Sequence, residues 1–239
     1  GETVIENAAR EPEIVQLCDA LNTMGANIDG ISTDKIIIEG VEELQSADLD
    51  VIPDRIEAGT YLIAGAAMGE ITLNYCNPNH LDVLIEKLIQ AGAIIATSEN
   101  SISIKKANPI NPVDVTTEVY PGFPTDLQAQ WIALMAIASG SSVVTDTVYH
   151  DRFTHIPELN RLGANIELHD NIAKINGVDH LIGAPVMSTD IRASAALILG
   201  AIMARGKTDI SRVYHIDRGY ELIEKKFQAL GVDIVRKND

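Results

Sequence analysis

Four amphipathic helices, each ending at a glycine, recur along the chain. Apolar residues in these segments follow the i, i+3, i+4, i+7 spacing of a helix with one buried face. The glycine stands where a helix C-terminus favours a left-handed backbone, and we expect the apolar stretch after it to be a short strand. The segments are residues 14–28, 81–95, 156–166 and 222–234, with Gly25, Gly92, Gly163 and Gly231. A spacing of roughly 70 residues between these glycines indicates an internal repeat.

Three further helices, apolar nearly all round, alternate with the first set. They begin at Asp54-Arg55, Thr125-Asp126 and Thr189-Asp190 and are predicted to end near Gly69, Gly140 and Gly206. Asp54 with Glu57, and Thr125 with Gln128, have the spacing of a capping box. Because these helices are too short to span a bilayer, we predict that they are buried in the core.

Short β-branched segments complete each repeat. Strands are predicted over residues 33–41, 101–104 and 172–178, so that the unit reads strand, buried helix, strand, amphipathic helix and two strands. Residues 51–239 hold three whole units, whereas residues 1–50 hold an amphipathic helix without a buried partner. We therefore expect residues 1–50 to be the last unit of a truncated N-terminal domain, and residues 51–239 a three-repeat C-terminal domain. The alternative is that residues 1–50 are an N-terminal extension.

Charge and composition exclude several classes of function. The chain has 18 Lys+Arg against 34 Asp+Glu, a net charge of −16, which argues against general nucleic-acid binding and against electrostatic docking on anionic membranes. Its apolar runs fall short of a membrane span. Cys18 and Cys76 lack metal-ligand spacing and are too few for a disulfide framework, so we expect a reducing compartment.

Arginines beside acids are the first candidate chemistry. If the three buried helices run parallel, their N-termini form a face that favours anions. Arginine offers planar bidentate donors for carboxylate or phosphate. Four of the nine arginines lie at helix openings or in polar loops: Arg55, Arg152, Arg192 and Arg218. The alternative is that each is a solvated pair with its neighbouring aspartate.

Asp126 is a second candidate, since it lies in a proline-bracketed turn that opens a buried helix. Its carboxylate could only stabilise the helix dipole, or it could serve as a general base toward a hydroxyl. The histidines form no zinc motif, and no glycine-rich nucleotide loop is present in the sequence, so we expect neither a metal nor a cofactor.

Five motifs resemble the bacterial enolpyruvyl transferases, in particular those that act on UDP-N-acetylglucosamine. The motifs are PDRIEAGT at 53–60, FPTDLQAQ at 123–130, DRFTHIPEL at 151–159, TDIRASA at 189–195 and HIDRGYE at 215–221. The resemblance covers essentially the whole chain, as the C-terminal portion of a longer enzyme. It implies an α/β fold of two inside-out barrels, each built from three βαβαββ repeats with buried helices and outer sheets. Substrates would lie between the two domains.

The resemblance also implies an activity. It is transfer of the enolpyruvyl group from phosphoenolpyruvate to the 3-hydroxyl of UDP-N-acetylglucosamine by addition and elimination, the first committed step of peptidoglycan synthesis in the bacterial cytoplasm. The implied partners are these two small molecules and the missing N-terminal domain. 5-Enolpyruvylshikimate-3-phosphate synthase, which takes shikimate 3-phosphate, and a noncatalytic repeat binding domain are the alternatives.

Site residues carried over by motif are Asp126, Val148, Arg152, Asp190, Arg192 and Arg218. Asp126 would accept the proton of the sugar hydroxyl, and Val148 would hold the nucleotide sugar through its backbone. The three arginines would bind phosphate and carboxylate, with Asp190 orienting Arg192. Arg55 would brace the region between the domains.

Some family features are missing from this sequence. The family's Lys-Asn pair and its reactive cysteine belong to segments absent here, so no catalytic thiol is assigned to Cys18 or Cys76. Tyr120 stands where family members often carry histidine. We therefore expect the 239-residue chain alone to be inactive.

Overall fold

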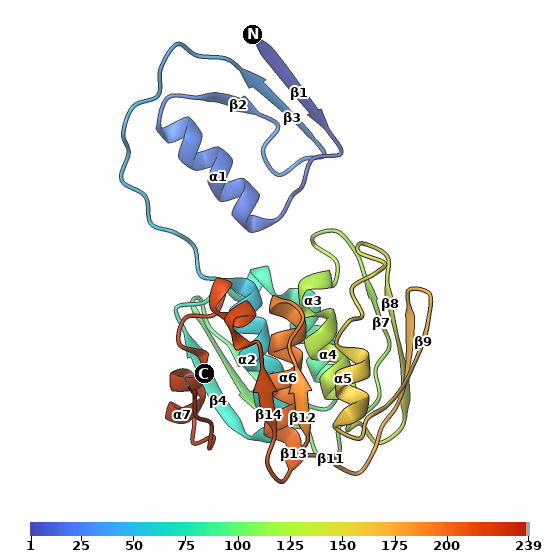
Figure 1. Ribbon diagram of the computed structural model, residues 1–239. Helices are drawn as coiled ribbons and strands as arrows, with labels where there is room; N and C mark the ends of the chain where they lie inside the picture. Colours follow the sequence, from blue (N-terminus) through green and yellow to red (C-terminus); the bar gives the residue numbers. More distant parts are fainter. Residues whose placement is uncertain (238–239) are drawn as a thin grey trace.

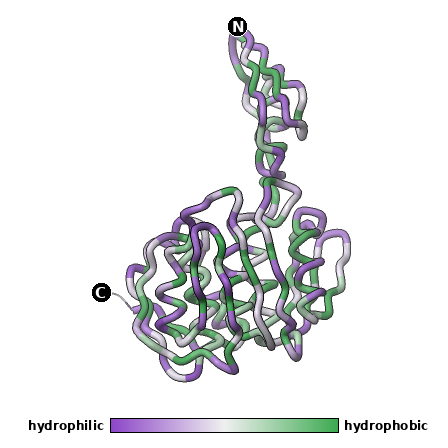
Figure 2. Tube along the Cα trace, turned by 90° about the vertical axis from the view of Figure 1, so that its right-hand side faces the viewer, coloured by the Kyte–Doolittle hydropathy of each residue, from purple (hydrophilic) through white to green (hydrophobic). Residues whose placement is uncertain are grey.

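The computed structural model describes residues 1–237, and its first part is a small lobe with its own core. Strands β1 (Glu2–Glu6), β2 (Asn27–Asp29) and β3 (Lys35–Glu39) form an antiparallel sheet in the order β1-β3-β2. Helix α1 (Pro12–Thr23) packs against this sheet through Cys18, Ile28 and Ile36. The lobe projects from the larger body that the rest of the chain forms (Figures 1 and 2).

Three buried helices form the centre of the larger body. They are α2 (Arg55–Met68), α4 (Gln128–Met135) and α6 (Ile191–Met203), and each contacts the other two. Figure 1 shows them side by side, with the strands outside them. Their residues belong to one continuous apolar core, which confirms the prediction that these helices are buried.

The first two repeat units each carry a complete outer sheet. In the first, β4 (Glu70–Asn74), β5 (Ile94–Thr97) and β6 (Ser101–Lys105) pair in the order β4-β6-β5, beside η1 (Pro78–His80) and α3 (Asp82–Gln90). In the second, β7 (Val115–Thr117), β8 (Ser141–Asp146), β9 (Asn165–His169) and β10 (Ile172–Asn176) pair in the order β7-β8-β10-β9, beside α5 (Ile156–Arg161). In the first sheet β6 is antiparallel to β4 and β5, and in the second β10 is antiparallel to β8 and β9.

The third unit has a different outer layer. It holds β11 (Leu181–Ile182), β12 (Pro185–Met187), β13 (Ala204–Arg205), β14 (Asp209–Ser211), η3 (Val213–Arg218) and α7 (Ile223–Ala229). Its strands form only the parallel pairs β11-β13 and β12-β14. The strand predicted after Gly231 is wrong for residues 232–237, because no neighbouring strand within the described chain pairs with them.

Most predicted helix ends are confirmed. Gly25, Gly92, Gly163 and Gly231 have φ of 97°, 100°, 88° and 89°. The side chains of Asp54 and Asp190 each accept hydrogen bonds from two backbone amides at the starts of α2 and α6. Capping chemistry that acts within a few residues could therefore be predicted from the sequence.

The second buried helix, α4, differs from its prediction at both ends. Residues Thr125–Leu127 form the short 3-10 helix η2, so Thr125 does not cap α4, and its hydroxyl donates to Asp146 instead. At the other end α4 stops at Met135, well before Gly140. Backbone carbonyls after it accept hydrogen bonds from the amides of residues 177 and 178, which follow β10. Tertiary contacts thus replace the last turns of the predicted helix.

None of the helices in the described residues has the length and apolarity needed to cross a bilayer. The predicted division of the chain at residue 50 stays a prediction.

Candidate active site

One carboxylate and two guanidinium groups meet at the N-terminal ends of the buried helices. Asp126 Oδ1 accepts hydrogen bonds from Arg152 Nη1 at 2.6 Å and from Arg192 Nε at 3.0 Å. Between 20% and 31% of each side chain is exposed, so a ligand can reach all three. We call these three residues the Asp126 cluster. Three segments far apart in the sequence supply it.

Each member of the cluster is held by local structure. Asp126 lies in η2, directly before α4. Arg192 is the second residue of α6, whose start is capped by Asp190. The guanidinium of Arg152 lies over the ring of Tyr149, with its Cζ 5.0 Å from the ring centroid, a cation–π contact. The side chains are therefore positioned before any ligand arrives.

Electrostatics keep Asp126 ionised. Burial by itself would raise the pKa of this carboxyl, but the charges and hydrogen bonds of Arg192 and Arg152 outweigh burial and lower the pKa below its usual value. The cluster holds two positive charges and one negative. It is thus a locally cationic place on a chain of net charge −16.

Asp190 holds the start of α6, where Arg192 lies. Its carboxylate accepts hydrogen bonds from the amides of Arg192 and Ala193 and from the hydroxyls of Thr154 and Thr189. Burial opposes its ionisation, but these bonds together lower the pKa of Asp190. Asp190 therefore holds Arg192 by its backbone, while the Arg192 guanidinium pairs with Asp126. The predicted role of Asp190 in orienting Arg192 stays a prediction.

Val148 lies in the loop between β8 and α5, and 43% of it is exposed. Its amide donates to Asp146 Oδ1 at 3.0 Å, so its carbonyl is the backbone group left for a ligand. The predicted contact between this backbone and a nucleotide sugar stays a prediction.

Arg218 is not joined to the Asp126 cluster by a hydrogen bond or ion pair within residues 1–237. It is exposed at the end of η3. The next residue, Gly219, lies close to Ile191, which precedes Arg192 at the start of α6. The fold thus brings Arg218 to the same end of α6, and its contact with substrate stays a prediction.

Arg55 links the two parts of the chain. It is 9% exposed, and its Nε and Nη2 donate to the two carboxylate oxygens of Glu13 on α1, at 3.1 and 2.9 Å. Its guanidinium also lies 5.6 Å from the centroid of the Tyr120 ring. This agrees with a bracing role. The aspartates next to Arg55 and Arg152 do not pair with them, so neighbouring-residue pairs are the wrong interpretation there.

Sequence reasoning missed Asp146, at the end of β8. Its carboxylate is fully buried and accepts hydrogen bonds from two threonine hydroxyls and two backbone amides around the site. The one signal in the sequence is an acid at the end of a β-branched strand, which is common in loops with no function.

His155, at the start of α5, supplies a stability prediction. Burial lowers its pKa to about 4, only partly offset by the charge of Asp190. Below pH 6.5 His155 becomes protonated in the unfolded chain but stays neutral in the folded chain. The free energy of unfolding therefore decreases as the pH falls from 6.5 toward 4. We expect this decrease in the free energy of unfolding to be about 2–3 kcal/mol smaller in His155→Leu. Urea unfolding at pH 7 and pH 4.5 measures it.

The exposed His150 provides the matched control, and His150→Gln is measured in the same way. An equally steep loss of stability in His155→Leu would contradict the assignment.

The chain is similar to several known proteins. The family model for EPSP synthase (3-phosphoshikimate 1-carboxyvinyltransferase) matches residues 1–227. The UDP-N-acetylglucosamine 1-carboxyvinyltransferase of Hydrogenovibrio crunogenus is 50% identical over 240 residues, which cover 100% of this chain and 57% of that protein. The same-named protein of Chlorobium chlorochromatii is 52% identical over 238 residues, 99% of this chain and 56% of that protein. The chain thus spans little more than half the length of these curated relatives.

Solved structures give the same fold. The enolpyruvyl transferase NikO from Streptomyces tendae superposes with a TM-score of 0.88 at 26% identity, over 99% of this chain and 57% of that one. EPSP synthase from Acinetobacter baumannii, at 18% identity, matches with a TM-score of 0.75 over 100% of this chain and 58% of that one. These likenesses confirm the predicted enolpyruvyl transferase fold. Since the family model covers nearly the whole chain, this protein belongs to the EPSP synthase (3-phosphoshikimate 1-carboxyvinyltransferase) family.

Proposed function

We propose that this chain is the C-terminal portion of a UDP-N-acetylglucosamine 1-carboxyvinyltransferase. The complete protein would transfer the enolpyruvyl group of phosphoenolpyruvate to the 3-hydroxyl of the sugar, the first committed step of peptidoglycan synthesis in the bacterial cytoplasm. The observation that carries the proposal is the Asp126 cluster, an accessible ionised carboxylate between two fixed arginines. Relatives 50% and 52% identical carry this enzyme's name.

Asp126 is the proton acceptor in the proposed reaction. As it takes the proton of the 3-hydroxyl, the sugar oxygen bonds to C2 of the enolpyruvyl group, and C3 gains a proton from an acid outside these residues. The resulting tetrahedral ketal then loses phosphate from C2 and a proton from C3, which restores the double bond. A carboxylate that is ionised at neutral pH is ready for the first of these steps.

The arginines of the cluster would bind the anionic groups of the substrates. Arg152 uses Nη1 and Arg192 uses Nε toward Asp126, so other N–H groups of both remain free for phosphate or carboxylate oxygens. When a substrate anion binds the two guanidinium groups, it offsets their positive charge near Asp126. The pKa of Asp126 then rises and its basicity increases. Arg218 would add a third cation. The Val148 carbonyl would bind the nucleotide sugar, with Asp190 holding the start of α6.

The acceptor substrate is tested by phosphate release. The complete protein is supplied with phosphoenolpyruvate and either UDP-N-acetylglucosamine or shikimate 3-phosphate. We expect release with the sugar nucleotide only. Release with shikimate 3-phosphate alone would instead make the protein an EPSP synthase, as the name of the family model allows.

The isolated chain gives a separate prediction. Residues 1–239 lack the part of the longer protein that would form the other side of the cleft, so the purified chain should release no phosphate above background from both substrates. Steady release by this chain, at the rate of the complete protein, would contradict the proposed division of the site.

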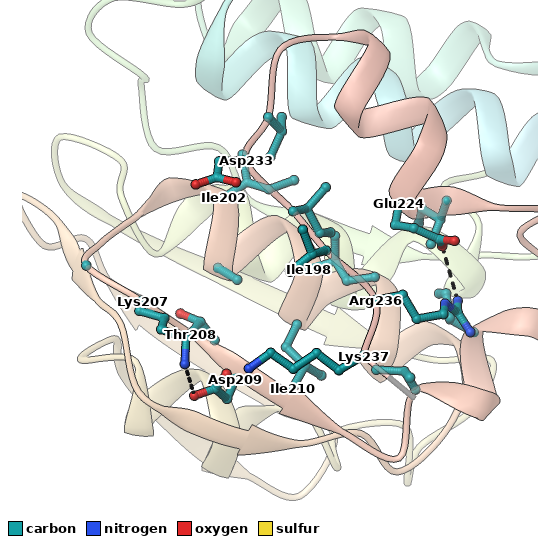
Figure 3. A pocket seen from close by; sticks show the side chains of 18 residues that line it. Ile198, Ile202, Lys207, Thr208, Asp209, Ile210, Glu224, Asp233, Arg236 and Lys237 are labelled. Carbon is teal, nitrogen blue, oxygen red and sulfur yellow. Dashed lines mark hydrogen bonds and ion pairs between the residues drawn. The ribbon is translucent and has the colours of Figure 1, made fainter. Parts of the chain in front are cut away.

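We also propose that the rest of the longer protein supplies a β-strand to the third repeat unit. A cavity of about 480 Å³ lies between residues 206–210 and residues 232–237. Its apolar floor includes Ile198 and Ile202 of α6 (Figure 3). In the first unit the middle strand β6 pairs with β4 and β5, and its Ile102 and Ile104 are fully buried. The occupant would therefore be an extended segment with alternating apolar residues.

Hydrogen exchange on the complete protein tests this strand. The amides of residues 232–235 should be protected to the extent of those in β5, the equivalent strand of the first unit. Exchange at the rate of an unstructured chain would show that no strand occupies the cavity.

A further inference from the structure

Asp146 is a buried carboxylate at the end of β8 whose acceptor positions are filled by neutral donors. Oδ1 accepts from Thr117 Oγ1 at 2.7 Å and from the amides of Val148 and Tyr149 at 3.0 and 2.8 Å. Oδ2 accepts from Thr125 Oγ1 at 2.6 Å. The side chain is 0% exposed. Within residues 1–237 no lysine, arginine or histidine pairs with it.

The backbone of Asp146 is fixed as well as its side chain. Its amide donates to the carbonyl of Asn171 at 2.9 Å, and its carbonyl accepts from Asn171 Nδ2 at 2.8 Å. A buried charge without a counterion is costly unless its hydrogen bonds are kept. The four donors are therefore held in place around this carboxylate.

Two of these contacts reach residues next to two members of the Asp126 cluster. Thr125 is the residue directly before Asp126. Tyr149 carries the ring under the guanidinium of Arg152. Asp146 thus joins the turn that carries the carboxylate to the loop that carries one of its arginines, and the Asp126–Arg152 ion pair closes the ring of contacts.

We propose that Asp146 is a positioning residue: through the Thr125 hydroxyl it sets where the Asp126 carboxylate lies. This proposal rests on the proposed function, because the position matters only if Asp126 takes a proton from substrate. A displacement of about 1 Å at a catalytic group can cost around 10²-fold in rate. The hydrogen bond from Thr125 therefore affects turnover more than ligand binding.

Two threonines on the same carboxylate provide a matched test. Thr125→Val removes the hydrogen bond between Asp146 and the residue before Asp126. Thr117→Val removes the hydrogen bond between Asp146 and β7, together with the one that the Thr147 amide donates to Thr117 Oγ1. In the complete protein we expect Thr125→Val to lower kcat about 10- to 100-fold with KM for both substrates within about twofold. Thr117→Val should lower the thermal midpoint and leave kcat within about twofold. Thr125→Ser, which keeps the hydroxyl, should restore kcat.

Other outcomes would contradict the positioning role of Asp146. Equal kcat losses in Thr125→Val and Thr117→Val, or no loss in Thr125→Val, would overturn the positioning role. So would a Thr125→Val protein that fails to fold while Thr117→Val folds, because the contact would then serve the fold. If the unaltered protein itself shows no turnover with phosphoenolpyruvate and UDP-N-acetylglucosamine, the proposed function fails, independently of the variants.

Discussion

Asp126→Asn in the complete protein should lower kcat for phosphate release by about 10²–10⁴-fold, the range that general acid–base groups contribute. Asparagine keeps the shape of the side chain and can still accept hydrogen bonds from Arg152 and Arg192, but it cannot take up the hydroxyl proton. The fold should survive, because the site is partly exposed and lies outside the apolar core. Steady-state kinetics and the thermal midpoint, measured together, check the prediction.

Asp151 is the matched control for this variant. It is an exposed acid next to Arg152 and forms no ion pair within the described chain. Asp151→Asn removes one negative charge near the site and should leave kcat within about twofold. A kcat for Asp126→Asn as high as that of Asp151→Asn would show that Asp126 is not the proton acceptor.

Arg192→Lys should have the second largest effect, a loss of about 10²–10³-fold in kcat, as seen when one fixed donor to a developing charge is removed. Lysine keeps the positive charge but loses the planar fork that reaches Asp126 and a substrate anion together. The exposed Arg161, whose nearest acid atom lies at 3.8 Å, provides the control. Arg161→Lys should be neutral.

The same variant changes the pH profile in a defined direction. Arg192 is the largest favourable influence that lowers the pKa of Asp126, against the opposing effect of burial. Turnover needs ionised Asp126, so kcat falls as the pH drops through this pKa. With the Arg192 contact weakened, the pKa rises and the fall begins at higher pH. An acid limb that stays in place, or moves to lower pH, would contradict the role of Arg192.

Features that depend on nearby residues could be predicted from the sequence. The four glycines that end helices and the aspartate caps at Asp54 and Asp190 lie where the local pattern predicts them. The repeat followed from their spacing, and the repeat in turn predicted buried helices with outer strands. The turn that holds Asp126 was singled out by its prolines and its place before an apolar helix.

Features that depend on distant contacts could not be predicted in this way. Thr125 has the sequence of a helix cap, yet its hydroxyl donates to Asp146, 21 residues away. Asp190 and Arg192 are near neighbours, yet the guanidinium pairs with Asp126, 66 residues earlier. The strand expected after Gly231 needs a neighbouring strand that residues 1–237 do not provide. For Thr125 and Arg192, a partner brought in by the fold replaces the local one, whereas the strand after Gly231 has no partner within residues 1–237.

A crystal structure of the complete protein with UDP-N-acetylglucosamine tests the central claim most directly. We predict that the 3-hydroxyl lies within hydrogen-bond distance, about 2.6–3.2 Å, of the Asp126 carboxylate. Phosphate or carboxylate oxygens of an added second ligand should contact Arg152 or Arg192. A sugar ring bound elsewhere, with Asp126 still paired to both arginines and facing solvent, would contradict the account.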